Sequence, residues 1–117
     1  MLPRRQRLTA RRDFTTTVRS GRRVRSGALV GHVLVTPSED EPRAGLIVTR
    51  AVGNSVQRHR VSRVLRHACA RGLGQLPPGT LIVLRALPGA AARDSRLAED
   101  VAAIIGIVAL MSKVVFF

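Results

Sequence analysis

The stretch 51–66, near the middle of the chain, combines a turn, a helix start and a dense set of arginines. Gly53-Asn54 is a turn dipeptide, and Asn54 followed three residues later by Gln57 has the form of a capping box, which predicts a helix beginning there. The first turn of a helix favours negative side chains, yet this helix opens with Arg58 and Arg60. The pattern therefore indicates a bound anion, and phosphate suits arginine forks and free backbone N–H groups best.

Positions at about 100° per residue divide this helix into two arcs. Arg58 lies near the edge of the apolar arc, where we expect it to reach from the helix mouth toward a neighbouring element and an external ligand. An ordinary amphipathic helix with a solvated basic face is the alternative. The apolar arc holds Val61, Val64, Leu65, Ala68 and Cys69, and the opposite arc holds His59, Arg60, Arg63, Arg66, His67 and Arg71.

The charge balance favours a nucleic-acid partner. The chain has 20 Lys and Arg against 7 Asp and Glu, a formal net charge of +13, and its one lysine is Lys113. Arginine grips phosphate with two donors and stacks on bases, although a genomic preference for arginine codons would give the same bias. Without Trp or Tyr, base stacking falls to Phe14 and to arginine planes. Cys69 has no partner for an internal disulfide, which favours a reducing, cytoplasmic location.

The first quarter of the chain is strongly basic. Residues 1–7 are expected to form a flexible basic leader without the apolar segment of a secretory signal, and a transit peptide is the alternative. Thr9 is predicted to cap a short helix that carries Phe14 and Val18 on one face and ends at Ser20-Gly21. A basic loop with Arg22, Arg23 and Arg25 follows, as a second surface for phosphates.

The remaining elements predict a single α/β domain over residues 1–117. Residues 28–35 and 44–49 are expected to form an antiparallel strand pair, and 80–86 a buried strand. A loop at 88–93 precedes a last helix that opens around Ser95 and Asp100. The resulting order predicts a two-layer α/β sandwich, with helices packed on a small sheet of about four strands.

Catalytic groups are sparse. The histidines, the cysteine and the acids show no metal-ligand spacing and no paired carboxylates on a predicted face, so we expect neither catalytic residues nor a metal site. His59 is a candidate general base, but no carboxylate that would orient it lies nearby in sequence. A polar or stacking role on the basic face is the other interpretation of His59.

The segment 45–66, with its Val-Gly-Asn turn and spaced arginines, resembles the signature of the bacterial ribonuclease P protein subunit. The resemblance covers residues 8–100, and further matches are Leu8, Arg11-Arg12-Asp13-Phe14, Gly21-Arg22-Arg23 and Leu76-Pro77-Pro78-Gly79-Thr80. It implies an α/β sandwich with a left-handed crossover at the arginine helix. It also implies a subunit that pairs 1:1 with a catalytic RNA, whose bound Mg²⁺ serves the removal of the 5′ leader from precursor tRNA.

The resemblance assigns two sets of binding residues. Those expected to meet the catalytic RNA are Arg50, Asn54, Arg58, His59, Arg60, Arg63 and Arg66. Those expected to bind the leader of precursor tRNA are Arg11, Arg12, Phe14 and Val18, with apolar sheet residues, where single-stranded bases can stack.

Some positions depart from the family pattern. His59 stands where asparagine is usual, Ser62 where lysine is usual, and Ala51 where a second basic residue is common, so we expect weaker RNA affinity in the same role. Residues 101–117 begin like the family's last amphipathic helix but become apolar on all sides. We expect a buried helix with a mispaired or frameshifted tail; a membrane anchor is the alternative, although the run is shorter than the roughly 20 residues that a span needs.

Other functions fit the same charge and size. A ribosomal or ribosome-assembly protein would share the arginine bias, and a non-specific nucleic-acid binder would respond to salt alone. A protein-only nuclease would need acids or histidines that converge on a metal.

Overall fold

The computed structural model describes residues 2–115 and has the predicted α+β architecture. Met1 and the end of the predicted apolar tail, Phe116 and Phe117, lie outside the described residues. The chain order is helix, three strands, helix, strand, helix, which confirms the predicted fold class. The elements are α1 (Arg11–Ser20), β1 (Arg22–Ser26), β2 (Leu29–Val35), β3 (Arg43–Ile47), α2 (Ser55–Gly72), β4 (Thr80–Ala86) and α3 (Leu97–Val115), with short 3-10 turns at Arg4–Gln6, Arg50–Val52, Leu73–Gln75 and Ala90–Arg96.

The four strands lie in the order β1-β2-β4-β3, and this order corrects the predicted strand pairing. β2 and β3 are not neighbours, because β4 lies between them, antiparallel to β2 and parallel to β3. A parallel pair needs a long crossover, and α2 supplies it between β3 and β4. The left-handed crossover that the resemblance implies would be this β3-α2-β4 connection.

The basic loop predicted after α1 is instead the edge strand β1. It pairs with β2 across a tight turn, with Arg23 opposite His32 and Arg25 opposite Val30. Gly27 takes a positive φ of 57° in that turn, a conformation that side chains other than glycine adopt rarely. Because strand side chains alternate between faces, Arg23 and Arg25 share one face of the sheet.

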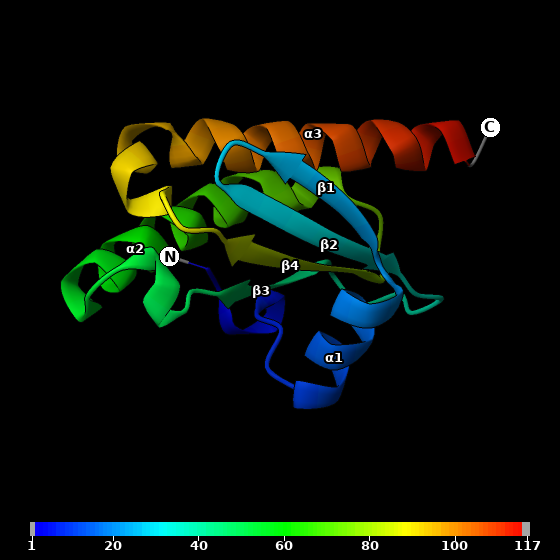
Figure 1. Cartoon of the computed structure of the whole chain (residues 1–117). Helices are drawn as coiled ribbons and strands as arrows, with labels where there is room; N and C mark the ends of the chain where they lie inside the picture. The colour runs from blue at the N-terminus through cyan, green and yellow to red at the C-terminus, as the bar shows by residue number, and fades with distance from the viewer. Residues whose placement is uncertain (1, 116–117) are drawn as a thin grey trace.

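α2 and α3 cover one face of the sheet and enclose the main core (Figure 1). Ile82 and Leu84 of β4 face this layer, together with Leu29 and Val33 of β2. The helices contribute residues at helical spacing, of which those exposed by 1% or less are Val61, Leu65, Cys69, Leu97, Val101, Ile104 and Ile105.

α1 lies on the opposite face, where a smaller apolar cluster forms (Figure 1). Leu81 and Val83 of β4 are buried there against Leu8, with Phe14 and Val18 of α1 partly buried beside them. β4 is therefore covered on both faces, which explains its continuous apolar sequence. The cluster spans only part of this face.

The segment expected to be a flexible leader is packed against the domain. Leu2 is buried, Arg7 forms a parallel bridge with Ala44, and the Leu8 N–H donates to the Ala44 carbonyl at 2.8 Å. Arg5 pairs with Glu41 at 2.8 Å. The N-terminal residues thus cover the outer edge of β3.

The predicted starts of the first two helices have different outcomes. The capping box of α2 is confirmed, because Asn54 accepts from the Gln57 N–H and Gln57 accepts from the Asn54 N–H, both at 2.9 Å. The predicted Thr9 cap of α1 is wrong, since Ala10 occupies the cap position and no side chain caps the helix.

α3 corrects the expectation of a helix buried on all sides. Asp100 and the apolar residues of one face are buried, whereas Ile107 and Leu110 are 43% and 65% exposed. The helix begins at Leu97 after a 3-10 turn, so Ser95 does not open it. Within residues 2–115, no helix is both long and apolar enough to cross a membrane.

Candidate nucleic-acid interface

The arginine side of α2 forms the first candidate surface. The predicted arcs are confirmed, because Val61, Leu65 and Cys69 are buried while His67 and Arg71 are exposed. Four residues of the predicted RNA-binding set are exposed along the helix: His59, Arg60, Arg63 and Arg66. The capping box fixes where the helix begins and so fixes the direction of this row.

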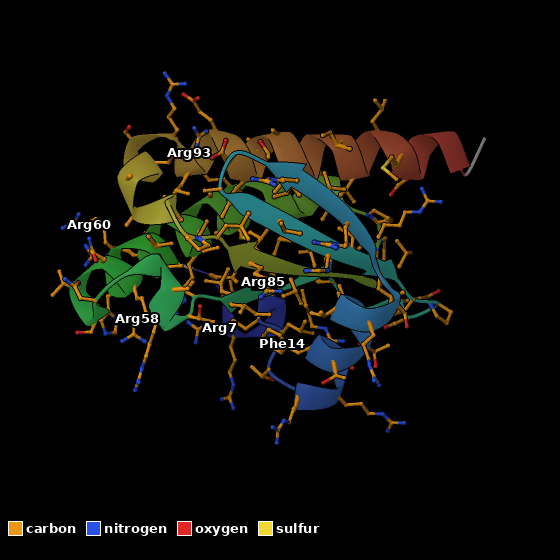
Figure 2. The ribbon with its side chains drawn as sticks, viewed as in Figure 1. Arg7, Phe14, Arg58, Arg60, Arg85 and Arg93 are labelled. Atoms are coloured by element: carbon orange, nitrogen blue, oxygen red, sulfur yellow. The ribbon has the colours of Figure 1, made fainter. Side chains whose placement is uncertain are left out.

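Arg58 differs from the other arginines of α2, as its place at the edge of the apolar arc predicts. Its side chain is half-buried, and its Nε atom is shielded from solvent without a hydrogen-bond partner in residues 2–115. Figure 2 shows Arg58 and Arg60 leaving the N-terminal part of α2 in different directions. A buried donor with no partner favours a bound acceptor, which phosphate would supply.

Arg50 and Asn54 lie on the connection between β3 and α2. Arg50 is exposed in the 3-10 turn Arg50–Val52, whereas the side-chain oxygen of Asn54 is already engaged in the capping box. Asn54 therefore acts first on the shape of the helix mouth. Because β3 and β4 are parallel, their carboxyl ends lie at the same end of the sheet. Arg85, near the end of β4 and opposite Ile47, therefore lies at the end from which the connection to α2 leaves.

The predicted leader residues lie on or beside the α1 face of the sheet. Phe14 packs so closely over Gly45 of β3 that a Cβ atom there would collide with the ring. Arg11 and Arg12 are exposed in the first turn of α1, while Phe14 and Val18 turn toward the sheet. The structure thus brings Phe14 and Val18 together, with Arg11 and Arg12 at the end of the same helix.

A further polar group on this face escaped the sequence-based prediction. His32 of β2 is only 4% exposed, lies directly opposite Val83 and Arg23, and has no hydrogen-bond partner for either ring nitrogen among the described residues. Arg85, two residues beyond Val83, shares its face. Figure 2 shows Arg85 and Phe14 on the same side of the sheet. The alternation of side chains along strands places His32 and Arg85 on one face, but this can be worked out only when β2 and β4 are known to be neighbours. The sequence alone did not predict that pairing.

The surroundings of His32 disfavour its charged form. Burial lowers the pKa of His32 below its usual value of 6.5, and the positive charges of Arg23 and Arg85 lower it further. The imidazole is therefore neutral near pH 7, with one donor nitrogen and one acceptor nitrogen to offer. A buried polar ring without a hydrogen-bond partner among the described residues is unusual in a purely structural surface, so the α1 face is a second candidate site.

The described acids do not converge on a metal site. Asp13 lies 3.7 Å from Arg43, Glu41 pairs with Arg5, and Asp100 pairs with Arg93 at 3.1 Å. Within residues 2–115, no three His, Cys, Asp or Glu side chains gather as metal ligands. These residues do not fit a Mg²⁺ site on the protein itself.

The single cysteine is a packing residue. Cys69 is fully buried in α2, and burial raises the pKa of its thiol to about 12. The reactive thiolate is therefore strongly disfavoured at neutral pH.

Comparison with known proteins agrees with this arrangement. The ribonuclease P family model matches residues 2–108, which include all four strands and the first part of α3. The chain belongs to the ribonuclease P protein family. The ribonuclease P protein component of Rhodococcus opacus is 48% identical over 82% of this chain and 82% of its own length. That of Streptomyces bikiniensis is 47% identical over 86% and 89%.

Solved ribonuclease P proteins share the fold. The Staphylococcus aureus protein superposes with a TM-score of 0.78 at 19% identity, over 87% of this chain and 94% of that one. The Thermotoga maritima protein gives 0.73 at 23% identity, over 86% and 96%. The chain is thus a protein component of the endoribonuclease that processes tRNA, and the ribosomal alternative is not favoured. The family name implies a ribonuclease P RNA as its partner.

Proposed function

We propose that this chain binds the ribonuclease P RNA through α2 and the 5′ leader of precursor tRNA through the α1 face of the sheet. The exposed row of His59, Arg60, Arg63 and Arg66, extended by Arg50 and Arg58 at the helix mouth, is suited to the phosphates of a folded RNA. The catalytic RNA supplies Mg²⁺ and the chemistry of cleavage; in support, no three described acids, histidines or cysteines gather as metal ligands, and Asp13, Glu41 and Asp100 each lie beside an arginine. One protein joins one RNA in the cytoplasm.

The leader site rests on one observation, the unpaired His32 between Arg23 and Arg85. The arginines offer phosphate contacts, and Phe14 offers an aromatic ring beside the apolar cluster of Leu81 and Val83. Single-stranded RNA is recognised by this combination of cationic side chains and a stacking surface. A double helix would not present unstacked bases to the ring of Phe14.

The two surfaces meet at the end of the sheet where the parallel strands β3 and β4 both have their carboxyl ends. Arg85 lies near the end of β4 on the leader face, and Arg50 follows the end of β3 on the way into α2. A substrate leader bound on the sheet would therefore approach the RNA held by α2 at this end of the sheet. This arrangement accounts for a protein that acts by positioning two RNAs.

The direct experiment is cleavage of precursor tRNA by ribonuclease P RNA at low Mg²⁺, with and without this protein. We expect the protein to stimulate cleavage at the correct 5′ site and to be inactive without the RNA. Activity of the protein alone would contradict the proposal, and so would equal cleavage rates with and without the protein. A leaderless tRNA competitor measures how much of the affinity comes from the leader.

A further inference from the structure

We propose that binding of the leader to the α1 face is coupled to proton uptake by His32. The inference rests on the proposed leader site and adds a pH-dependent property to it. It begins from geometry, because His32 is 4% exposed and both of its nitrogens lack a partner among residues 2–115. The ring is held in place with hydrogen-bonding capacity that the free protein does not use.

The charged groups that face His32 in the free protein are cationic. Arg23 lies opposite it on β1, and Arg85 lies on the same face of β4. Arg25, the next residue of β1 on this face, directs its Nε to the Gly27 carbonyl at 3.4 Å. α1 turns Phe14, Thr17 and Val18 toward the sheet, and none of these three side chains is ionisable.

Among the described residues, the charges that act on His32 are those of Arg23 and Arg85, without a carboxylate. Asp13, the only acid of α1, lies by Arg43 on β3 at 3.7 Å. The hydroxyl of Thr17, the buried polar residue of α1, donates its proton to the Asp13 carbonyl at 2.7 Å, so it does not donate to the ring, and it carries no charge. Protonation of His32 in the free protein would add a third positive charge to an unbalanced pair.

A bound RNA phosphate reverses this situation. A phosphate held by Arg23 and Arg85 neutralises the two charges that oppose protonation, and its oxygens accept a hydrogen bond from an imidazolium. Both arginines are exposed, long side chains that can move to admit the RNA to the ring between them. The bound state therefore favours the protonated ring, whereas the free state favours the neutral one.

Thermodynamic linkage then fixes the sign. A group that has a higher pKa in the complex than in the free protein takes up a proton on binding, so affinity rises as pH falls between the two values. Each unit by which RNA raises the pKa of His32 strengthens leader binding about tenfold at the acidic limit. Leaderless tRNA does not occupy the site and should lack this dependence.

The first test is an NMR titration of the His32 ring signals in the full chain, with and without single-stranded oligouridylate, between about pH 5 and 8. We expect oligouridylate to shift these signals and to raise the pKa of His32. Shifted signals with an unchanged or lowered pKa would overturn the coupling and leave the leader site intact. Signals that ignore the RNA would overturn the leader site itself. The unchanged chain is used, so no variant has to fold.

The second test uses the holoenzyme and an uncleavable precursor tRNA. The ratio of its affinity to that of mature tRNA should increase severalfold as pH falls from about 8 toward 6 and should become flat in the H32Q variant. H67Q is the matched control, because His67 is exposed on α2, away from the sheet face, and should keep the slope. A ratio that is equally flat in the unchanged holoenzyme would refute the coupling.

Discussion

The two faces of the sheet use the same strand for different purposes. On the face covered by α2 and α3, β4 contributes Ile82 and Leu84 to a core that reaches across both helices. On the α1 face it contributes Leu81 and Val83 to a small cluster and then Arg85 to an open, cationic surface. One face holds the domain together, and the other keeps the ring nitrogens of His32, to which no described residue offers a hydrogen bond.

This difference separates the face that stabilises the domain from the face where we propose that the leader binds. The unpaired nitrogens of His32 would be costly in a finished core, where nearly all buried polar groups have partners. On the α1 face they carry the same cost in the free protein, and a ligand that satisfied them would recover it on binding. The larger core on the opposite face offsets what this surface lacks.

The largest expected effect comes from a matched pair of substitutions on β4. Leu84→Ala should lower the free energy of unfolding by about 2–5 kcal/mol, because it opens a cavity in the main core. Leu81→Ala, in the same strand but in the smaller cluster of the α1 face, should cost less, since its site can collapse more easily. Urea denaturation measures both, and equal losses would remove the proposed division between the faces.

The structure also shows how much of the difference between the two faces can be predicted from the amino-acid sequence. The helix starts predicted at Thr9 and Ser95 were wrong, but other local signals succeeded: the capping box of Asn54 and Gln57 located α2, and helical periodicity separated its buried and exposed sides. Both depend on residues within a few positions of one another. For the same reason Arg58 could be identified as an exception before the fold was known.

Signals that depend on distant residues failed. β1 is rich in arginine and becomes a strand because it pairs with β2, and β4 inserts between β2 and β3 without any local mark in either. His32, Arg23 and Arg85 come together only through these pairings. The common face of Phe14 and Val18 could be predicted from the sequence, because the two residues lie one turn apart on a single helix. Their role in leader binding was inferred from the resemblance.

The second prediction tests α2 without disturbing either core. Arg63→Ala or Arg66→Ala should weaken assembly with ribonuclease P RNA by about 1–3 kcal/mol and lower the salt slope by about one unit per lost phosphate contact. Both side chains are exposed, so the free energy of unfolding should change little. Arg96→Ala removes the same charge from an exposed position just before α3 and serves as the control. Equal losses of RNA affinity at all three positions would mean that the net charge of the protein, and not the arginine row of α2, determines binding.

The third prediction concerns the aromatic ring of the α1 face. Phe14→Ala should weaken binding of precursor tRNA by about 1–3 kcal/mol through loss of base stacking, with a smaller change for mature tRNA. Phe14→Leu retains apolar contact with the cluster around Leu81 while it removes the stacking surface, so it separates the two roles. Competition binding with the two tRNAs measures the difference. Equal losses for both RNAs would make Phe14 a packing residue only.

The smallest expected effect is a pH dependence of stability in the free protein. The pKa of His32 is lowered on folding, chiefly by burial and further by Arg23 and Arg85, so the unfolded chain binds a proton more readily than the folded chain. The stabilisation of the neutral ring is complete above the unfolded value of 6.5 and is lost as pH falls from there through the folded pKa. His32→Gln should flatten this part of the curve, whereas His67→Gln, at an exposed position, should not. Thermal unfolding between about pH 5 and 7.5 measures the slopes. If the unchanged chain and the His32→Gln variant lose stability in parallel as pH falls, His32 is not the group that makes the sheet sensitive to acid. The contrast between the face covered by α2 and α3 and the α1 face would then rest on RNA binding alone.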